Sequence, residues 1–214
     1  MHMLPSGRNP WLTMWTAPRE TLREILEAYP EQRVLLLAIL AGIAWAFHAA
    51  VAQHIGRWNN LWVILLFCVI GGAVLGGVIG IYVGSYLLWR SGRWLGGLAS
   101  LQQIRIAMVW AFVPLIWSAI LYLPLLVLEG KELFVRGALP TTANPLLIFA
   151  LLTLSFVQWT AYVWHKVVIV LCLAEVQKFS IWKAVANVLL GWAIVGVPII
   201  ILIVVAIVLP NLLK

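Results

Sequence analysis

The sequence predicts an all-α membrane protein, a five-helix transmembrane bundle with short amphipathic helices at the membrane surface. The chain of 214 residues has a mean hydropathy of +1.04, and only 10% of its residues are charged. Its apolar residues are concentrated in five runs, each reaching the roughly 20 residues needed to cross the hydrocarbon core of a bilayer. This composition excludes a soluble globular domain and a disordered chain.

Residues 1–33 form a polar N-terminal segment that contains one amphipathic helix. From Leu22 to Tyr29, apolar residues recur at i, i+3, i+4 and i+7, while arginine and glutamate residues occupy the opposite face. The helix is too short and too charged to span a bilayer. Two interpretations stay open: it lies on the membrane surface with Trp11 and Trp15 as interfacial anchors, or it docks on the cytoplasmic face of the protein itself.

Residues 34–209 are predicted to form one membrane domain, and residues 210–214 a short external tail. The first apolar run begins only at Val34, after a charged segment, so we expect an uncleaved signal anchor rather than a cleaved signal peptide. The five predicted spans are residues 34–53, 61–88, 108–128, 146–173 and 184–209.

A repeat of glycines marks the second span, with Gly72, Gly76, Gly80 and Gly84 four residues apart. On an α-helix these residues share one face, and small residues allow close helix packing in lipid. Because glycine in a helix costs about 1 kcal/mol relative to alanine, we expect close packing to offset that cost. The face is interpreted as an intramolecular helix contact, a homo-oligomer interface or a groove lining a polar pathway.

Prolines and a second short helix are expected to shape the remaining spans. Alternating apolar and polar residues at positions 98–105 predict a surface helix between the second and third spans. Pro114 and Pro124 should kink the third span or mark its ends, and Pro198 should kink the last one.

The fourth span is the most polar. Ser155, Gln158, Tyr162 and His165 lie within one stripe at helical spacing, and polar side chains inside a bilayer normally face protein or water. Lys166 lies beside the stripe, where it either extends toward the inner headgroups or serves a substrate or a proton. The stripe is interpreted as an interior hydrogen-bonded network or as a polar path, and His165 as an interior histidine or a ligand.

A short polar turn with Glu175, Lys178 and Ser180 separates the last two spans, and Ser180 is placed to cap the final helix. If the N-terminus is cytoplasmic, the inner segments hold nine lysine and arginine residues and the outer segments hold four. The positive-inside rule therefore predicts a multi-pass protein of the cell (inner) membrane, with a cytoplasmic N-terminus and an external C-terminus.

Residues for chemistry are scarce. The chain has no aspartate, and its glutamates lie outside or at the edges of the apolar runs, so the spans offer no carboxylate pair. His48 and His54 point in different directions on a helix, and no activated nucleophile is evident. We expect no enzyme activity, catalytic residue, metal or cofactor. The basic residues are spread along the chain, which fits membrane sidedness rather than nucleic-acid binding.

Two polar stretches stand out: Asn9–Thr21 lies ahead of the first span, and Leu173–Ala184 lies between the last two spans. Together with Val113-Pro114 early in the third span, their order and spacing resemble the YIP family of Ypt/Rab-interacting membrane proteins, in its prokaryotic branch. The resemblance covers about residues 9–209 and implies a five-helix domain with a cytoplasmic N-terminus.

Eukaryotic members of that family are linked to small GTPases and vesicle traffic. The N-terminal part is very short here, so we do not expect a small GTPase as partner. Our first hypothesis is an integral membrane scaffold or adaptor without catalytic activity, which binds membrane-protein partners or further copies of itself within the lipid bilayer. The alternative is a small permease or channel with a polar path along the fourth span.

Overall fold

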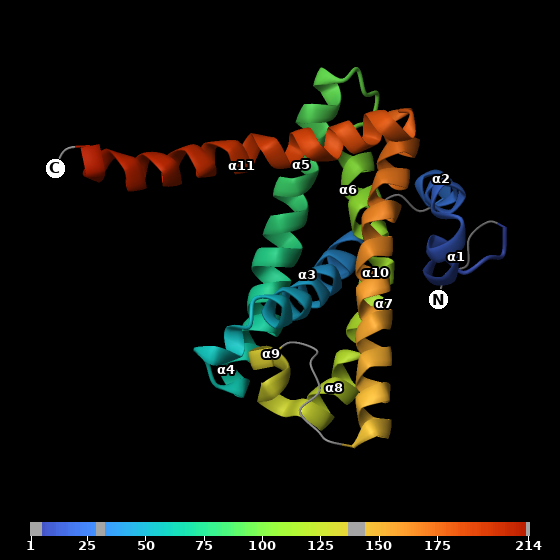
Figure 1. Ribbon diagram of the computed structural model, residues 1–214. Coiled ribbons are helices and arrows are strands. Elements are labelled where there is room, and N and C mark those ends of the chain that lie inside the picture. Colours follow the sequence, from blue (N-terminus) through green and yellow to red (C-terminus); the bar gives the residue numbers. More distant parts are fainter. Residues whose placement is uncertain (1–5, 29–32, 137–143, 213–214) are drawn as a thin grey trace.

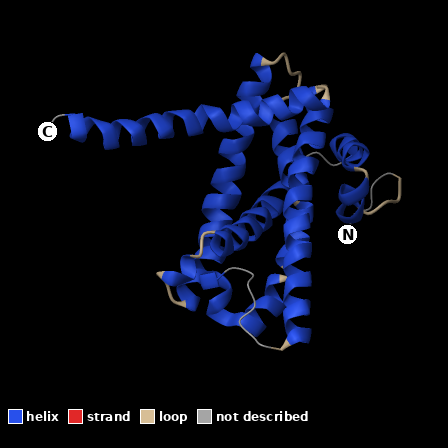
Figure 2. Cartoon of the chain, viewed as in Figure 1, coloured by secondary structure: helices blue, strands red, loops and turns tan. Residues whose placement is uncertain are grey.

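The computed structural model describes residues 6–28, 33–136 and 144–212. All regular elements in these ranges are helical (Figure 2). In chain order they are α1 (Pro10–Thr16), α2 (Pro18–Ala28), α3 (Val34–Ala52), η1 (Ile55–Arg57), α4 (Leu61–Leu66), η2 (Phe67–Ile79), α5 (Gly80–Trp94), α6 (Leu101–Ala111), α7 (Val113–Ala119), α8 (Tyr122–Glu129), η3 (Gly130–Glu132), α9 (Leu133–Arg136), α10 (Pro145–Gln177) and α11 (Ile181–Leu212).

Five helical stretches are long and apolar enough to cross a membrane, which confirms the predicted fold class. Among them, the second and third each combine several consecutive helices. The stretches are Val34–Ala52, Leu61–Trp94, Leu101–Arg136, Pro145–Gln177 and Ile181–Leu202.

Helix α10 runs along the bundle, and α3 crosses between the line of α5 and the line of α10 (Figure 1). We call the end where α10 and α5 finish and α6 begins the Glu175 end. It is the upper end in Figure 1, and α1 and α2 pack beside it. The buried apolar residues form two clusters: one joins α1, α2, α6 and the later part of α10 toward the Glu175 end, and the other joins α4, α8, α9 and the start of α10.

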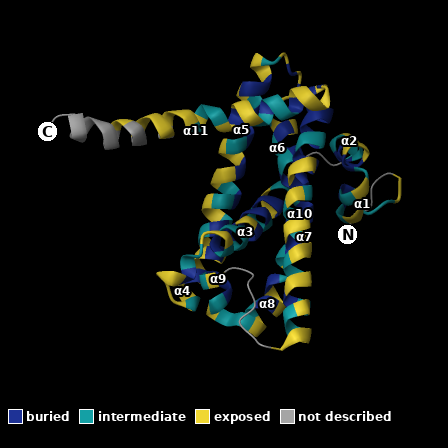
Figure 3. Cartoon of the chain, in the orientation of Figure 1, coloured by how far each residue is buried: buried dark blue, intermediate teal, exposed yellow. Residues whose placement is uncertain are grey.

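Helix α11 leaves the bundle at the Glu175 end and projects away from it (Figure 1). Only its first part is packed: Ala184 and Asn187 are fully buried, while Leu189 and Trp192 are exposed (Figure 3). The helix continues as one element through Pro198, where the sequence predicted a kink.

The third span is interrupted where its prolines predict. Helix α6 ends at Ala111, Pro114 is in the first turn of α7, and Pro124 is in the first turn of α8. Since proline lacks the N–H group that continues a helix, it is tolerated best in a first turn.

The short helix predicted near residues 98–105 is present but begins later than expected. Ser100 caps α6 through a capping box with Gln103, so the helix begins only at Leu101 and continues to Ala111 as part of the third span. Ile104 is fully buried and Leu98 lies outside the helix, 74% exposed. The alternation of apolar residues therefore marks a face that is buried against the bundle.

Candidate functional site

The closest helix contact joins α3 to η2. A Cβ atom on Gly72 would lie 2.8 Å from Cβ of Ala46 and 2.9 Å from the carbonyl oxygen of Gly42. A Cβ atom on Gly77 would lie 3.0 Å from the carbonyl carbon of Ala38. Since these neighbours include backbone atoms that cannot rotate away, only glycine fits at both positions. The two helices therefore pack backbone against backbone, as small residues allow in membranes.

The four-residue glycine repeat does not form one continuous contact. Gly76 adjoins Gly42, because a Cβ atom there would lie 3.3 Å from the Gly42 Cα. In contrast, the neighbour within reach of Gly80 belongs to its own segment (the Leu75 carbonyl oxygen), and Gly84 has open space beside it. The structure thus differs from the single α-helical glycine face predicted by the sequence.

The reason is the conformation of η2, which is a π-helix over Phe67–Ile79. A π-helix closes i→i+5 hydrogen bonds and takes more residues per turn than an α-helix. The buried positions along this stretch are accordingly Cys68, Gly72, Gly77 and Ile81, separated by four, five and four residues. Gly77 and Gly42, which the four-residue pattern did not include, are therefore central to the contact.

The polar residues of α10 divide into two groups. His165 and Gln158 face the interior and are at most 7% exposed. His165 Nδ1 lies 2.9 Å from the carbonyl oxygen of Ala111. Because a carbonyl only accepts, Nδ1 carries the proton and Nε2 is left as an acceptor. His165 Nε2 and Gln158 Nε2 are buried without a hydrogen-bond partner among the described residues.

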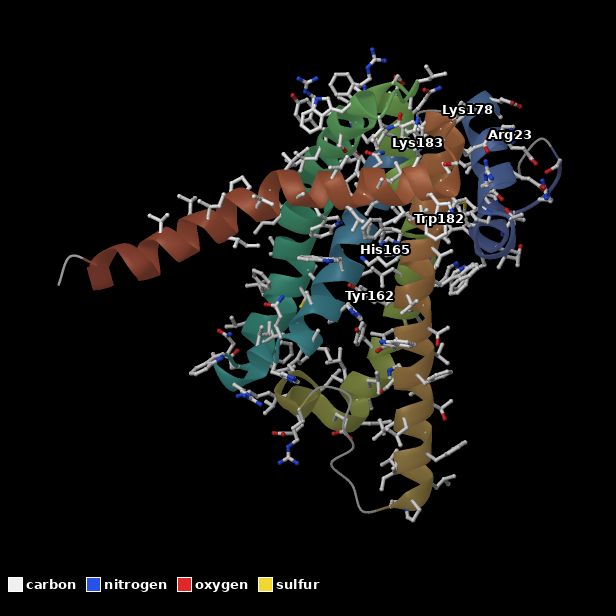
Figure 4. The ribbon with its side chains drawn as sticks, turned by 45° about the horizontal axis from the view of Figure 1, so that its top comes forward. Arg23, Tyr162, His165, Lys178, Trp182 and Lys183 are labelled. Atoms are coloured by element: carbon white, nitrogen blue, oxygen red, sulfur yellow. The ribbon has the colours of Figure 1, made fainter. Side chains whose placement is uncertain are left out.

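The second group is Tyr162, Lys166 and Ser155, and Figure 4 shows Tyr162 near His165 on α10. The Tyr162 ring stacks on the ring of His48 from α3, with centroids 4.1 Å apart, and Lys166 Nζ lies 4.6 Å from the centre of the Tyr162 ring. The hydroxyl of Tyr122 lies 3.4 Å from His48 Nδ1. Ser155 instead donates to a backbone carbonyl of its own helix at 2.8 Å. The sequence offered no way to place His48 beside the fourth span.

The largest polar cluster surrounds Glu175 at the end of α10. Its carboxylate accepts from Arg19 Nε at 3.2 Å, from Arg23 Nε and Nη2 at 3.2 and 3.0 Å, and from Lys178 Nζ at 3.0 Å. The Glu175 side chain is 5% exposed. A buried carboxylate is tolerated only when cations or hydrogen bonds replace its water, and here both arginines come from the N-terminal helix.

Further contacts hold α1 and α2 against the bundle. Leu22 and Ile25 are buried, the indole N–H of Trp164 donates to the carbonyl oxygen of Trp15 at 3.1 Å, and the rings of Trp11 and Trp110 meet edge to face. Helix α2 is thus docked on the protein itself, through the face that carries Leu22 and Ile25.

The turn after α10 is fixed by its own backbone. Lys178 adopts a left-handed conformation with φ of 58°, which ends α10, and the Phe179 N–H bonds back to the carbonyl oxygen of Ala174 at 2.9 Å. Ser180 Oγ accepts from the Lys183 N–H at 3.4 Å and so caps α11. Lys178 and Ser180 therefore lie in the turn, and Lys178 is joined directly to Glu175 in the last turn of α10.

A buried amide packs beneath this turn. Gln177 lies between Gly92 and Gly97, where added Cβ atoms would meet its side-chain amide carbon at 2.8 and 2.7 Å. On the same side, Ser91 Oγ donates to Asn187 Oδ1 at 2.7 Å, which joins α5 to α11. Within the described residues, no group of three histidine, cysteine, aspartate or glutamate side chains is arranged to hold a metal ion.

Comparison of the sequence with known proteins gives a match to a family model. The family model described as the Yip1 domain matches residues 12–210, which include most of α1, all of α2 and all five candidate spans. No curated protein and no solved structure matched the chain. A family match over nearly the whole chain, together with five apolar helices, establishes a multi-pass membrane protein, and the chain belongs to the YIP family.

Proposed function

We propose that the protein is a scaffold or adaptor of the cell (inner) membrane that acts without catalysis and binds partners at its Glu175 end. The observation that carries the proposal is the Glu175 cluster, which joins α2, near the N-terminus, to the turn between α10 and α11. Segments far apart in the sequence thereby form one fixed surface rather than independent flexible segments.

That surface presents side chains suited to partner binding. Trp182 is 83% exposed and Leu98 is 74% exposed, and exposed apolar groups beside charges are typical of interaction sites. Arg90 and Arg93 lie at the end of α5, and Lys183 lies at the start of α11, both at the same end of the bundle (Figure 1). By the positive-inside rule, this excess of basic residues favours a cytoplasmic position for the Glu175 end and for the N-terminus.

The test is site-specific photo-crosslinking in native membranes, with a photoreactive amino acid at Leu98 or Trp182. We expect discrete protein adducts at both positions and none at Trp159, an exposed residue in the middle of α10 that serves as control. A further copy of this chain within the adduct would identify a homo-oligomer. Solute flux through the purified protein alone, in proteoliposomes, would overturn the proposal.

A second candidate function is a small permease or channel. It is favoured by the buried unpaired nitrogens of His165 and Gln158, because polar groups inside a membrane often line a water-filled path. The glycine contact gives it no support, since η2 is packed against α3 at Gly72 and Gly77.

Aqueous thiol labelling distinguishes the two candidates. Gly76→Cys, Gly80→Cys and His165→Cys are each introduced after replacement of Cys68 and Cys172, the two free cysteines. We expect hydrophilic reagents to leave these positions unlabelled while Trp58→Cys, a loop control that is 86% exposed, reacts. Labelling of His165→Cys, together with flux that His165→Ala alters, would establish the permease instead.

A further inference from the structure

The Glu175 cluster contains more positive than negative charge. Arg19, Arg23 and Lys178 each pair with the one carboxylate, so the four side chains carry a net charge of +2. The carboxylate is 5% exposed, whereas the three cations are 45%, 57% and 62% exposed. The negative charge is therefore inside the cluster, and the uncompensated positive charge is on its outer side.

The cations also have hydrogen-bond donors that Glu175 does not use. A guanidinium has five N–H donors and an ammonium has three. Among the described residues, Arg19 donates to Glu175 through Nε only, and Lys178 makes one hydrogen bond, to the same carboxylate. Figure 4 shows Arg23 and Lys178 close together where α2 meets the end of α10. The outer side of the cluster thus offers several N–H groups to an acceptor.

Two carboxylates of α2, those of Glu20 and Glu24, do not neutralise this charge. Glu20 and Glu24 both pair with Arg8, which precedes α1, and Glu24 also accepts from Ser6 at 2.6 Å. They are thus engaged by residues 6–8 rather than by the cations around Glu175.

The position of the cluster suits a lipid headgroup. It lies where α10, a candidate membrane span, ends, and that is the level at which headgroups meet the protein. Trp182 and Lys183 follow in the first turn of α11, and Trp182 is 83% exposed. Tryptophan, lysine and arginine are preferred at this level, and guanidinium groups match phosphate oxygens in geometry and charge.

We propose that Arg19, Arg23 and Lys178, held together by Glu175, bind the phosphate group of an anionic phospholipid. Glu175 fixes the spacing of the cations without cancelling their charge, and the lipid phosphate accepts the remaining N–H donors. This site does not depend on the scaffold function, because it requires only that the Glu175 end meets a membrane surface.

The test is native mass spectrometry of the full chain, purified in mild detergent and titrated with phosphatidylglycerol or with phosphatidylcholine. We expect phosphatidylglycerol to bind more tightly. Arg19→Gln and Lys178→Gln should each weaken it about fivefold, since a basic residue near an anionic surface contributes about that factor. Lys178→Arg should keep the binding, and Arg57→Gln, which changes an exposed arginine in η1 beyond the far end of α3, should leave it unchanged.

Three outcomes would overturn the proposal: equal binding of the two lipids, an equal loss in Arg57→Gln, or no loss in either cluster variant. Inorganic phosphate is titrated separately. If it binds with the same dependence on Arg19 and Lys178 while phosphatidylglycerol does not, the ligand is a soluble phosphate and the lipid assignment is wrong. Each variant's thermal unfolding is measured alongside, and a loss of lipid binding counts only where the unfolding midpoint matches the parent.

Discussion

Arg23 donates two hydrogen bonds to the carboxylate of Glu175, at 3.2 and 3.0 Å, across a sequence separation of 152 residues. The arginine is in α2 and the glutamate is in the last turn of α10, so this pair attaches the N-terminal helix to the membrane domain. Because the carboxylate is buried and the guanidinium is more than half exposed, the attachment depends chiefly on Glu175. If the pair is broken, water can replace the hydrogen bonds of the exposed Arg23 guanidinium, but not those of the buried Glu175 carboxylate.

Glu175→Gln should loosen α1 and α2 from the bundle. The neutral amide loses the charge-assisted hydrogen bonds from the arginines, and a hydrogen bond to a charged group contributes about 2 kcal/mol. That corresponds to a roughly 30-fold larger population in which the helices are open. Trypsin cleaves after Arg19 and Arg23 when the helices are open. If opening and closing are fast relative to cleavage, limited digestion should therefore be about 30-fold faster.

The matched control is Glu20→Gln, which removes a 65% exposed carboxylate from the same helix. It should leave the digestion rate almost unchanged, since exposed ion pairs contribute little. Equal rates in Glu175→Gln and in the parent protein would show that Trp11, Leu22 and Ile25 hold the helices without the ion pairs.

The sequence predicted the helices far better than it predicted this attachment. Apolar runs of sufficient length are a local property, and they indicated five spans. The pairing of Glu175 with Arg19 and Arg23 is a long-range property, because nothing in the local pattern states which helix ends meet. Glu175 was predicted in the polar turn that follows the fourth span, whereas it lies in the last turn of α10. The position of α2 was left open between docking on the protein and lying on the lipid.

Glu24 should titrate below its ordinary value. Hydrogen bonds from Ser6 and then from Arg8 lower the pKa of its carboxyl from 4.5. A lowered pKa in the folded state means that the contact is fully present above pH 4.5 and is lost as pH falls through the lower folded-state pKa. Ser6→Ala should shift the pKa of Glu24 back up, which carboxyl carbon NMR of the micelle-bound protein would measure. An unchanged pKa in Ser6→Ala would contradict the contact.

His165 should matter for stability more than its neighbour Lys166. His165→Leu removes the donor that satisfies the Ala111 carbonyl oxygen, and a buried polar group left unpaired costs about 1–3 kcal/mol. Lys166→Leu replaces an exposed side chain in a membrane helix and should change the free energy of unfolding far less. Unfolding in mixed micelles with increasing denaturing detergent compares the two, and a larger loss in Lys166→Leu would contradict this order.

The glycine contact also shows where sequence reasoning stopped. A repeat of four predicted one face because an α-helix brings residues four apart together. The π-helical turns of η2 shift that face to Gly72 and Gly77. Helical type within an apolar run is not encoded by hydropathy, so the glycines could be recognised as a packing feature while the residues in contact could not.

Two glycine substitutions therefore separate the α-helical prediction from the observed register. In Gly77→Ala the new methyl group would meet the backbone of Ala38 and Ile39 from α3, and overpacking of this kind costs about 1–3 kcal/mol. In Gly84→Ala the methyl group enters open space, so the higher helix propensity of alanine should leave the protein unchanged or up to about 1 kcal/mol more stable. The same micelle unfolding assay measures both variants.

If one glycine face ran through the whole repeat, Gly84→Ala would be the destabilising change and Gly77→Ala, which is outside that repeat, would be tolerated. The π-helical register requires the opposite order, because it brings Gly77 against the α3 backbone and leaves Gly84 without a neighbour.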